Sequence, residues 1–254
     1  MTTTPDRGAH LADRVVIVTG ASSGIGAATA TALAAAGAKI VLAARNPDKL
    51  DDLLTTIAAG GGTAVARVTD VTDADDVLGL AQFARTEYGH IDALVNNAGL
   101  MLFSAWADVA LDDWNSMIDT NIRGYLHAIR AVLPEMLERG SGHILNMSSV
   151  AGIHVGDTSG VYSATKFFIR GITDSLRQEV GVDKGIQISM VSPGVIDTGW
   201  TDKVSSDGGR EVAERVNADA ITAERVASAV LYALDQPADV TVNDIVIHPT
   251  KQPW

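Results

Sequence analysis

Tyr162 and Lys166 are the residues whose types and spacing most directly suggest chemistry. They lie four positions apart, so on a helix their side chains project from the same face. A free tyrosine has a pKa of about 10, which is too high for a base at neutral pH. A neighbouring ammonium group favours the phenolate, so we expect Lys166 to lower the pKa of Tyr162 toward the range useful for proton transfer.

Two adjacent serines precede this pair. Ser148 and Ser149 end a predicted strand, and Ser149 lies thirteen residues before Tyr162. A hydroxyl in this position can hydrogen-bond a substrate oxygen and share its developing negative charge with the tyrosine hydroxyl. A Tyr-x3-Lys pair alone is usually an accident of a helix surface, but with a strand-end serine it predicts proton exchange at a carbonyl or alcohol oxygen.

A glycine-rich turn near the N-terminus has the features of a phosphate site. The segment Thr19–Gly26 links a β-branched run to an Ala-rich run and contains Gly20, Gly24 and Gly26. Glycines let the backbone turn tightly and approach a ligand, and the following helix N-terminus offers free N–H groups to a pyrophosphate. The spacing is Gly-x3-Gly-x-Gly, not the standard Gly-x-Gly-x-x-Gly. Its place in the first strand–helix unit favours a dinucleotide over a plain tight turn.

The end of the second predicted strand indicates which dinucleotide. An NAD site typically has an Asp or Glu here for the ribose 2′-hydroxyl. This sequence has Ala43-Ala44-Arg45-Asn46 instead. Arg45 can make a two-point contact with a 2′-phosphate, although a solvated surface arginine is the simpler alternative. The missing acid and the added cation together predict NADP(H).

The elements that must position these residues follow from the hydrophobic pattern. Short β-branched runs alternate with longer helical segments, and most of the short runs are apolar throughout, as in strands buried on both faces of a parallel sheet. The expected strands are Val15–Thr19, Ile40–Ala44, Ala64–Val68, Ala93–Asn96, His143–Met147, Gln187–Val191 and Asp244–His248. The expected helices are Ile25–Ala36, Pro47–Ala59, Ala74–Tyr88, Leu111–Glu138, Tyr162–Val180 and Ala223–Leu234. This alternation predicts an α/β fold, a single doubly wound parallel-sheet Rossmann-type domain.

No linker or repeat divides the chain, so we expect one domain over residues 12–254 after a flexible N-terminal tail, residues 1–11. The tail is polar and does not have the apolar core of a signal peptide. Residues 199–217 form the exception to the regular pattern, since Ser205-Ser206-Asp207-Gly208-Gly209 predicts a long connection. Such a connection in a compact domain is usually functional. We expect it to be a substrate lid, and the alternative is a disordered surface loop unrelated to catalysis.

Composition excludes several classes of function. The net charge is −12, so the protein does not have the positive charge that binding to nucleic acid or an anionic membrane requires. There is no Cys, and the six His are scattered, so we expect no metal site. The apolar runs are strand-sized and too short for a membrane span. We therefore expect a cytoplasmic protein.

The motifs resemble, in order, those of compact short-chain dehydrogenases/reductases. They are Thr19–Gly26, Asn96-Asn97-Ala98-Gly99, Asn121, Ser149, Tyr162-x3-Lys166 and Pro193-Gly194. The resemblance runs from Val15 to His248 and implies a catalytic tetrad of Asn121, Ser149, Tyr162 and Lys166. It assigns the oxygen-binding role to Ser149, a relay water to Asn121, whose alternative is a helix kink, and a grip on the nicotinamide ribose to Lys166.

The same resemblance implies the cofactor contacts. The glycine turn would hold the phosphates, Asp70 and Val71 would flank the adenine, and Asn97 to Gly99 would pass under its ribose. Pro193-Gly194-Val195 with Thr198 would hold the carboxamide. The full expected set is Gly20, Ser22, Ser23, Gly24, Ile25, Gly26, Arg45, Asp70, Val71, Asn97, Ala98, Gly99, Tyr162, Lys166, Pro193, Gly194, Val195 and Thr198. Ser23 departs from the pattern of many NADP enzymes, which carry a second cation there.

We therefore expect an NADP(H)-dependent oxidoreductase that interconverts a small-molecule ketone or aldehyde and an alcohol. The alternative is a non-catalytic NADP(H) sensor or scaffold on the same fold. The expected pocket walls are Met101, Val150, Ile153, Val155, Val195 and Trp200. A narrower resemblance, carried by Ile25–Ala28, Met117–Asn121 and the ending Pro249–Gln252, is to bacterial NADP-dependent aldehyde and hydroxy-acid dehydrogenases, including the clavaldehyde-reducing type. Resemblance also implies a homo-oligomer, a tetramer or dimer.

Overall fold

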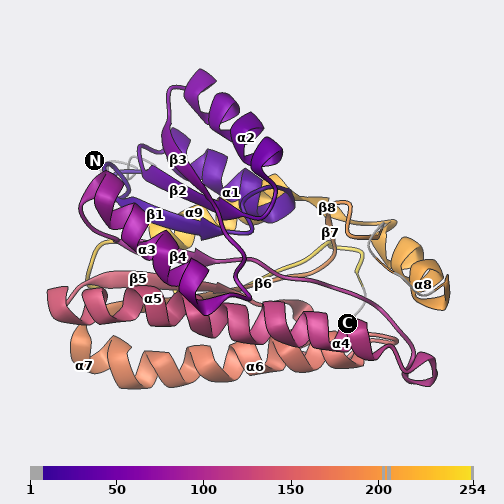
Figure 1. Ribbon diagram of the computed structural model, residues 1–254. Coiled ribbons are helices and arrows are strands. Elements are labelled where there is room, and N and C mark those ends of the chain that lie inside the picture. Colours follow the sequence, from indigo (N-terminus) through magenta and orange to yellow (C-terminus); the bar gives the residue numbers. More distant parts are fainter. Residues whose placement is uncertain (1–7, 202–203, 205–206, 253–254) are drawn as a thin grey trace, which may run out of the picture.

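The protein is built on a parallel sheet of seven strands in the order β3-β2-β1-β4-β5-β6-β9 (Figure 1). The computed structural model describes residues 8–201, 204 and 207–252. The strands are β1 (Val15–Thr19), β2 (Lys39–Ala44), β3 (Thr63–Val68), β4 (Ala93–Asn96), β5 (Gly142–Met147), β6 (Ile186–Pro193) and β9 (Asp244–Ile247). Two short parallel strands, β7 (Ile196–Asp197) and β8 (Ile221–Thr222), form a separate pair.

Helices cover both faces of this sheet. They are α1 (Gly24–Ala35), α2 (Pro47–Ala59), α3 (Ala74–Tyr88), α4 (Leu111–Ile118), α5 (Gly124–Arg139), α6 (Gly160–Leu176), α7 (Val182–Lys184), α8 (Asp207–Asn217) and α9 (Ala223–Leu234). Side chains of α1, α2 and α9 pack on one face, and those of α3, α5 and α6 on the other. The predicted α/β fold, with a doubly wound Rossmann-type sheet, is confirmed.

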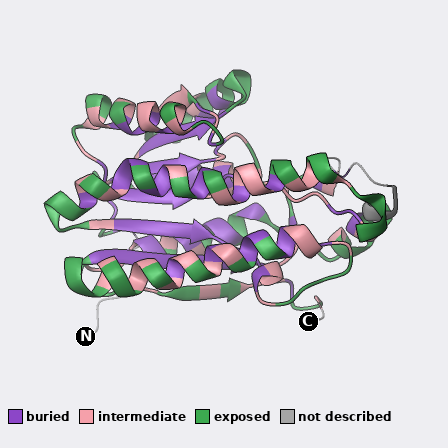
Figure 2. Cartoon of the chain, turned by 60° about the horizontal axis from the view of Figure 1, so that its bottom comes forward, coloured by how far each residue is buried: buried purple, intermediate pink, exposed green. Residues whose placement is uncertain are grey.

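The central strand β1 shows why both faces need a helical cover. Val16 and Val18 belong to the core on the α1 face, whereas Val15 and Ile17 belong to the core on the α3 face, because successive strand side chains point to opposite sides. All four are at most 1% exposed. Full burial of such a side chain contributes about 1.5–3 kcal/mol. Figure 2 shows the result, a sheet whose central strands are buried between helices that are exposed on their outer sides, whereas the edge strands β3 and β9 are partly exposed.

Local signals fix the helix ends close to the predicted positions. Asn46 caps α2, since its Oδ1 accepts a hydrogen bond from the Lys49 N–H at 3.0 Å, and Pro47 starts the helix. Asp73 caps α3 in the same way. These caps end the loops at the carboxyl edge of the sheet, where ligands bind in folds of this kind.

The predicted helix Leu111–Glu138 and the predicted connection over residues 199–217 both differ from the structure. The segment predicted as one helix, Leu111–Glu138, consists of α4, a π-helical turn at Asp119–Arg123 and α5. The irregular connection expected over residues 199–217 contains α8. The serines Ser205 and Ser206 that suggested a loop lie outside the described residues.

The packed domain begins earlier than predicted. Leu11, which we placed in a flexible tail over residues 1–11, is completely buried in the core. The backbone N–H groups of Gly8 and His10 donate to the two carboxylate oxygens of Asp235, at 2.6 and 2.9 Å. The prediction of a flexible tail is therefore wrong for residues 8–11, because the Asp235 carboxylate and the hydrophobic core hold them in place. Residues 1–7 lie outside the described residues.

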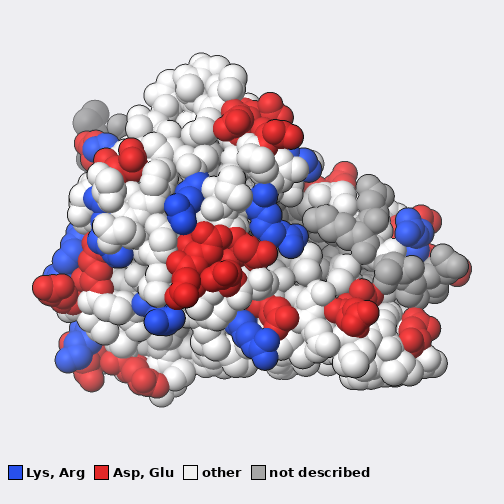
Figure 3. All heavy atoms as spheres, in the orientation of Figure 1, with Lys and Arg blue, Asp and Glu red and all other residues white. Residues whose placement is uncertain are grey.

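The described residues contain no helix that is long and apolar enough to cross a membrane, and no group of three potential metal-ligating side chains. On the face shown in Figure 3, acidic and basic side chains alternate over the surface.

Candidate active site

A cavity of about 760 Å³ lies at the carboxyl ends of the parallel strands. Its walls come from the segments that follow β1 to β6, and it lies where the strand order reverses between β1 and β4. Open α/β sheets bind their ligands in this crevice. The volume is within the range of about 300–1,000 Å³ that is usual for small-molecule and cofactor sites.

The glycine-rich turn forms part of the wall of this cavity and leads into the N-terminus of α1. Among the described residues no acidic side chain lies in the first turn of α1, and the Ser23 side chain makes no capping bond. The positive end of the helix dipole is thus open to an anion. Gly26 is required by packing, because a Cβ there would lie 2.2 Å from the carbonyl oxygen of Gly20. The turn therefore fits a pyrophosphate cradle.

Thr19 and Asn97 hold this turn against the next strand. The Thr19 hydroxyl accepts hydrogen bonds from the N–H groups of Asn97 at 2.9 Å and Ala98 at 3.1 Å. The Asn97 side chain donates to the carbonyl of Thr19 at 2.9 Å. Asn97 was predicted to pass under the adenine ribose, but its amide supports the turn, which leaves the backbone of residues 97–99 to face the cavity. Sequence reasoning missed Thr19 as a positioning residue.

Arg45 and Asp70 lie at the end of the cavity formed by the segments after β2 and β3. Arg45 follows β2 directly and is exposed at the cavity wall. Burial tends to raise the pKa of Asp70, but two hydrogen bonds from Thr72 and the charge of Arg45 keep it below its ordinary value. A cation and an ionised carboxylate thus lie close together where the adenosine half of a dinucleotide is expected.

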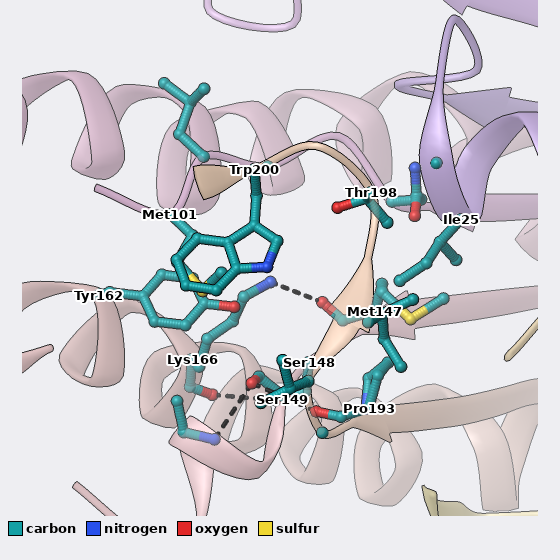
Figure 4. A pocket seen from close by; sticks show the side chains of 18 of the residues that line it. Ile25, Met101, Met147, Ser148, Ser149, Tyr162, Lys166, Pro193, Thr198 and Trp200 are labelled. Atoms are coloured by element: carbon teal, nitrogen blue, oxygen red, sulfur yellow. Dashed lines mark hydrogen bonds between the residues drawn. The ribbon is translucent and has the colours of Figure 1, made fainter. Parts of the chain in front are cut away.

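Tyr162 and Lys166 lie on the same face of α6, as predicted. Figure 4 shows the tyrosine hydroxyl and the lysine ammonium group pointing into the cavity. Lys166 Nζ lies 5.8 Å from the centre of the Tyr162 ring and donates a hydrogen bond to the carbonyl of Met147 at 3.0 Å. Tyr125 donates to the same carbonyl at 2.8 Å. Met147 O is thus an anchor for the lysine that the sequence did not reveal.

The pKa of Tyr162 differs from the expectation. Burial raises the pKa of Tyr162 to about 12, although a hydrogen bond with Ser149 acts to lower it. Burial also lowers the pKa of Lys166 to about 8. The predicted lowering of the tyrosine pKa by lysine is therefore not seen, because burial outweighs the hydrogen bond with Ser149. In this state the tyrosine is a protonated acid at neutral pH.

The two serines separate into different roles. Ser148 Oγ donates to the carbonyl of Lys166 at 3.3 Å and so joins β5 to α6. Ser149 Oγ lies against the Tyr162 side of the cavity, accepts from the N–H of Ala151 at 3.1 Å and donates to the carbonyl of Pro193 at 3.4 Å. The second bond is long, which leaves this hydroxyl able to turn toward a substrate oxygen.

Asn121 lies behind the cavity in the π-helical turn between α4 and α5. It is completely buried; its Oδ1 accepts from the N–H of Leu100 and its Nδ2 donates to the carbonyl of Leu100, both at 2.8 Å. A further bond of 3.1 Å reaches the hydroxyl of Thr165 on α6. The side chain is thus occupied by the protein, and both a helix irregularity and a structural tie are present at this residue.

Apolar side chains form the wall opposite the glycine turn. Trp200 is 7% exposed, packs edge-on against Phe103 with ring centres 5.2 Å apart, and donates from Nε1 to Asn217 Oδ1 at 3.1 Å. Phe103 in turn lies 6.4 Å from the Tyr162 ring. Ala213 of α8 belongs to the same cluster. Sequence reasoning identified Trp200 as a wall residue but missed Phe103.

The structure gathers the predicted site almost completely. Every expected catalytic and cofactor-binding residue lines the cavity except Asn121, which lies behind it. The wall residues that line it are Met101, Val150, Val155, Val195 and Trp200, and Ile153 does not.

Residues 14–209 match the model of the family described as short chain dehydrogenase. The chain belongs to the short-chain dehydrogenase/reductase family of oxidoreductases. An uncharacterized oxidoreductase of Listeria monocytogenes is 44% identical over 248 residues, which cover 95% of this chain and 98% of that relative.

Two solved structures extend the comparison to bound cofactors. The closed form of a serine dehydrogenase complexed with NADP⁺ has a TM-score of 0.86 at 30% identity, and the match covers 94% of this chain and 96% of that one. A short-chain dehydrogenase/reductase from Burkholderia phymatum in complex with NAD has a TM-score of 0.86 at 26% identity, covering 93% and 89%. The neighbours thus include binders of both nicotinamide dinucleotides.

Proposed function

We propose that this protein is an NADP(H)-dependent oxidoreductase that interconverts a ketone or aldehyde and an alcohol. The proposal rests on one continuous cavity, which is lined both by a glycine turn at a helix N-terminus and by Ser149, Tyr162 and Lys166. A dinucleotide in this cavity would extend from the phosphate cradle to the tyrosine.

The residues present fit such a cofactor. The N-terminus of α1 would hold the pyrophosphate, Arg45 would hold a 2′-phosphate, and Lys166 would hold the nicotinamide ribose. When bound, such a cofactor would supply the hydride in reduction and accept it in oxidation. NADP(H) is favoured over NAD(H) because β2 ends in Ala44-Arg45 without an acid, and a serine dehydrogenase neighbour is complexed with NADP⁺.

In the direction of reduction, the protein's own groups act on the carbonyl oxygen. Ser149 donates a hydrogen bond to this oxygen and stabilises its developing negative charge. Tyr162, protonated at neutral pH because burial raises its pKa to about 12, gives its proton to the nascent alkoxide. Lys166 then stabilises the phenolate, and a proton passed from a water near Asn121 through Lys166 would restore the tyrosine hydroxyl. Oxidation of an alcohol reverses these steps.

A cofactor-oxidation screen tests this proposal. Purified protein would be mixed with NADPH and panels of ketones, aldehydes and hydroxy acids, and absorbance at the nicotinamide band would be followed. We expect turnover with at least one panel member. Tight NADPH binding without turnover of any member would instead favour the alternative, a non-catalytic NADP(H) sensor or scaffold.

One feature favours a carboxylate on the substrate. Val212, Arg215 and Val216 of α8 all line the cavity, and Val212 packs with the cluster around Tyr162. The spacing puts Arg215 on the same helix face, where its guanidinium can make a charge-assisted pair with an anion. A serine dehydrogenase among the neighbours makes a hydroxy acid a fitting first substrate.

Arg215→Ala tests this substrate class. We expect KM for a hydroxy acid to rise about tenfold or more, since a hydrogen bond to a charged group is worth about 1.5–3 kcal/mol. KM for a neutral alcohol of the same size should stay unchanged. Equal changes for both substrates would contradict a carboxylate contact.

We also propose that residues 199–217 form a lid over cofactor and substrate, with Trp200 as its apolar wall. A serine dehydrogenase neighbour is described in a closed form with NADP⁺. We further propose a cytoplasmic homo-oligomer, a tetramer or dimer, and light scattering of the purified protein would give its mass in solution.

A further inference from the structure

The C-terminal segment, residues 248–252, packs directly on the loop Pro193–Val195, which we call the nicotinamide loop. The N–H of Gly194 donates to the carbonyl of Ile247 at 2.7 Å, which continues the pairing of β6 with β9 beyond the strands. The N–H of Val195 donates to Gln252 Oε1 at 3.0 Å. Two successive amides of the loop are thus bound by the end of the chain.

The space around Gly194 shows how closely the C-terminal segment packs on the nicotinamide loop. A Cβ at this position would lie 2.2 Å from Gln252 Oε1 and 2.5 Å from the Cβ of His248. Both distances are below any that real side chains adopt, so the glycine is needed to admit the C-terminal segment. The nearest atoms around Gly194 therefore belong to the C-terminal segment of the same chain.

Gln252 holds the loop through a bond with fixed direction. A backbone N–H can only donate, so the partner must be the amide oxygen of Gln252. Gln252 itself is positioned by a turn, since its N–H donates to the carbonyl of Pro249 at 3.0 Å. Pro249, Lys251 and Gln252 all line the cavity. The C-terminal segment thus lines the cavity together with the loop.

The tail also reaches the far side of the site. Lys251 Nζ lies 3.8 Å from the carboxylate of Asp219, just after α8. Both side chains are more than half exposed, so this ion pair contributes little. The hydrogen bond of Gln252 and the packing on Gly194 are the contacts that can fix the loop.

We propose that Gln252 is a positioning residue that fixes the nicotinamide loop and thereby the nicotinamide end of the cofactor. This inference rests on the proposed function for the identity of the ligand. Effects at the two ends of the cavity can be measured separately, because Gln252 acts on the nicotinamide end while the adenosine end lies against Arg45 and Asp70. Loss of the Gln252 oxygen should weaken binding of the whole dinucleotide. Binding of a ligand that has only the adenosine half should be unchanged.

The first experiment reads the hydrogen bond without any ligand. Amide hydrogen exchange at Val195 would be compared in the wild type, in Gln252→Met, which keeps the length but has no acceptor oxygen, and in Gln252→Glu, which keeps an acceptor. Gln82→Met, on the exposed side of α3, is the matched control. We expect faster exchange in Gln252→Met only. Equal exchange in all four proteins would overturn the proposal, whatever the cofactor.

The second experiment measures affinity for NADP⁺ and for adenosine 2′,5′-bisphosphate, which has the adenosine end alone. We expect Gln252→Met to bind NADP⁺ about two- to tenfold more weakly, the loss typical of one hydrogen bond. Binding of the bisphosphate should be unchanged in Gln252→Met. Gln252→Glu, which keeps an acceptor oxygen, should bind NADP⁺ about as well as the wild type. Equal losses for both ligands, or no loss, would overturn the positioning role.

Two further observations keep the result unambiguous. If thermal melting shows that Gln252→Met does not fold, Gln252→Asn serves in its place, since it keeps the amide but cannot span the same distance. A wild type that binds neither NADP⁺ nor the bisphosphate would contradict the proposed function, whereas exchange at Val195 would still decide whether Gln252 fixes the loop.

Discussion

At the scale of single residues, Arg45 carries the proposed choice between the two dinucleotides. It follows β2 at the cavity wall, where an acid would bind a ribose 2′-hydroxyl. We expect Arg45→Ala to weaken NADPH about ten- to a hundredfold, the worth of a hydrogen bond to a charged group, and to affect NADH much less. Titration of both cofactors into wild type and variant measures this difference. A similar loss for both would make Arg45 a general surface charge.

The residues with a chemical signature were predictable from the sequence, and those that hold them were not. Tyr162, Lys166 and Ser149 were identified because their types and spacing suit proton transfer. Thr19 was missed, since a threonine at a strand end has no signature of its own and its partner Asn97 lies 78 residues away. The pKa of Tyr162 was predicted in the wrong direction, because the sequence gives the neighbouring charge but not the depth of burial.

At the scale of elements, the segment 199–217 combines a predicted function with an unpredicted structure. The sequence indicated a long irregular connection, but residues 207–217 form α8, and the buried Ala213 faces the cluster around Trp200. Its Gly-rich start hid the helix, which is stabilised by packing on that cluster more than by its own propensity. At Asn121 the sequence suggested a helix kink only as an alternative, since the hydrophobic period of a helix continues through the π turn.

The lid proposal predicts protection from protease. Arg210 is an exposed trypsin site within α8, and Lys203, the second site in the sequence, lies outside the described residues. We expect cleavage in this segment to be fast without ligand and slow with NADPH and a substrate analogue, because bound ligand would order the segment over the cavity. Mass spectrometry of the fragments assigns the cut. Equal rates in both states would rule out the lid.

At the scale of the whole molecule, the sheet and its two helical layers were predictable because strand and helix periods alternate clearly along the chain. The buried His143 on β5 was not recognised. It is completely buried, its Nε2 lies 2.8 Å from Ser189 Oγ, and burial, aided by the charge of Arg14, lowers its pKa from 6.5 to about 3. The folded protein therefore keeps this imidazole neutral at pH values where the unfolded chain protonates it.

This difference makes stability depend on pH. Below about pH 6.5 the unfolded chain binds one more proton at His143 than the folded protein does. The stabilisation that the neutral imidazole gives above pH 6.5 is therefore lost progressively as the pH drops toward 3. The slope for one proton is about 1.4 kcal/mol per pH unit, or about 2 kcal/mol between pH 6.5 and 5. Urea unfolding at both pH values would compare wild type with His143→Gln. We expect a smaller loss in the variant, and identical losses would contradict the assignment.

The central claim is that the hydroxyl of Tyr162 transfers the proton in an NADP(H)-dependent carbonyl–alcohol reaction. Tyr162→Phe removes this oxygen and keeps the ring that packs against Phe103. With a substrate found in the cofactor-oxidation screen, kcat and the affinity for NADPH would be measured in both proteins. We expect kcat to fall about 10²- to 10⁴-fold, the usual contribution of a general acid, while the variant still binds NADPH. A variant that turns over the same substrate at a near-normal rate would contradict the account.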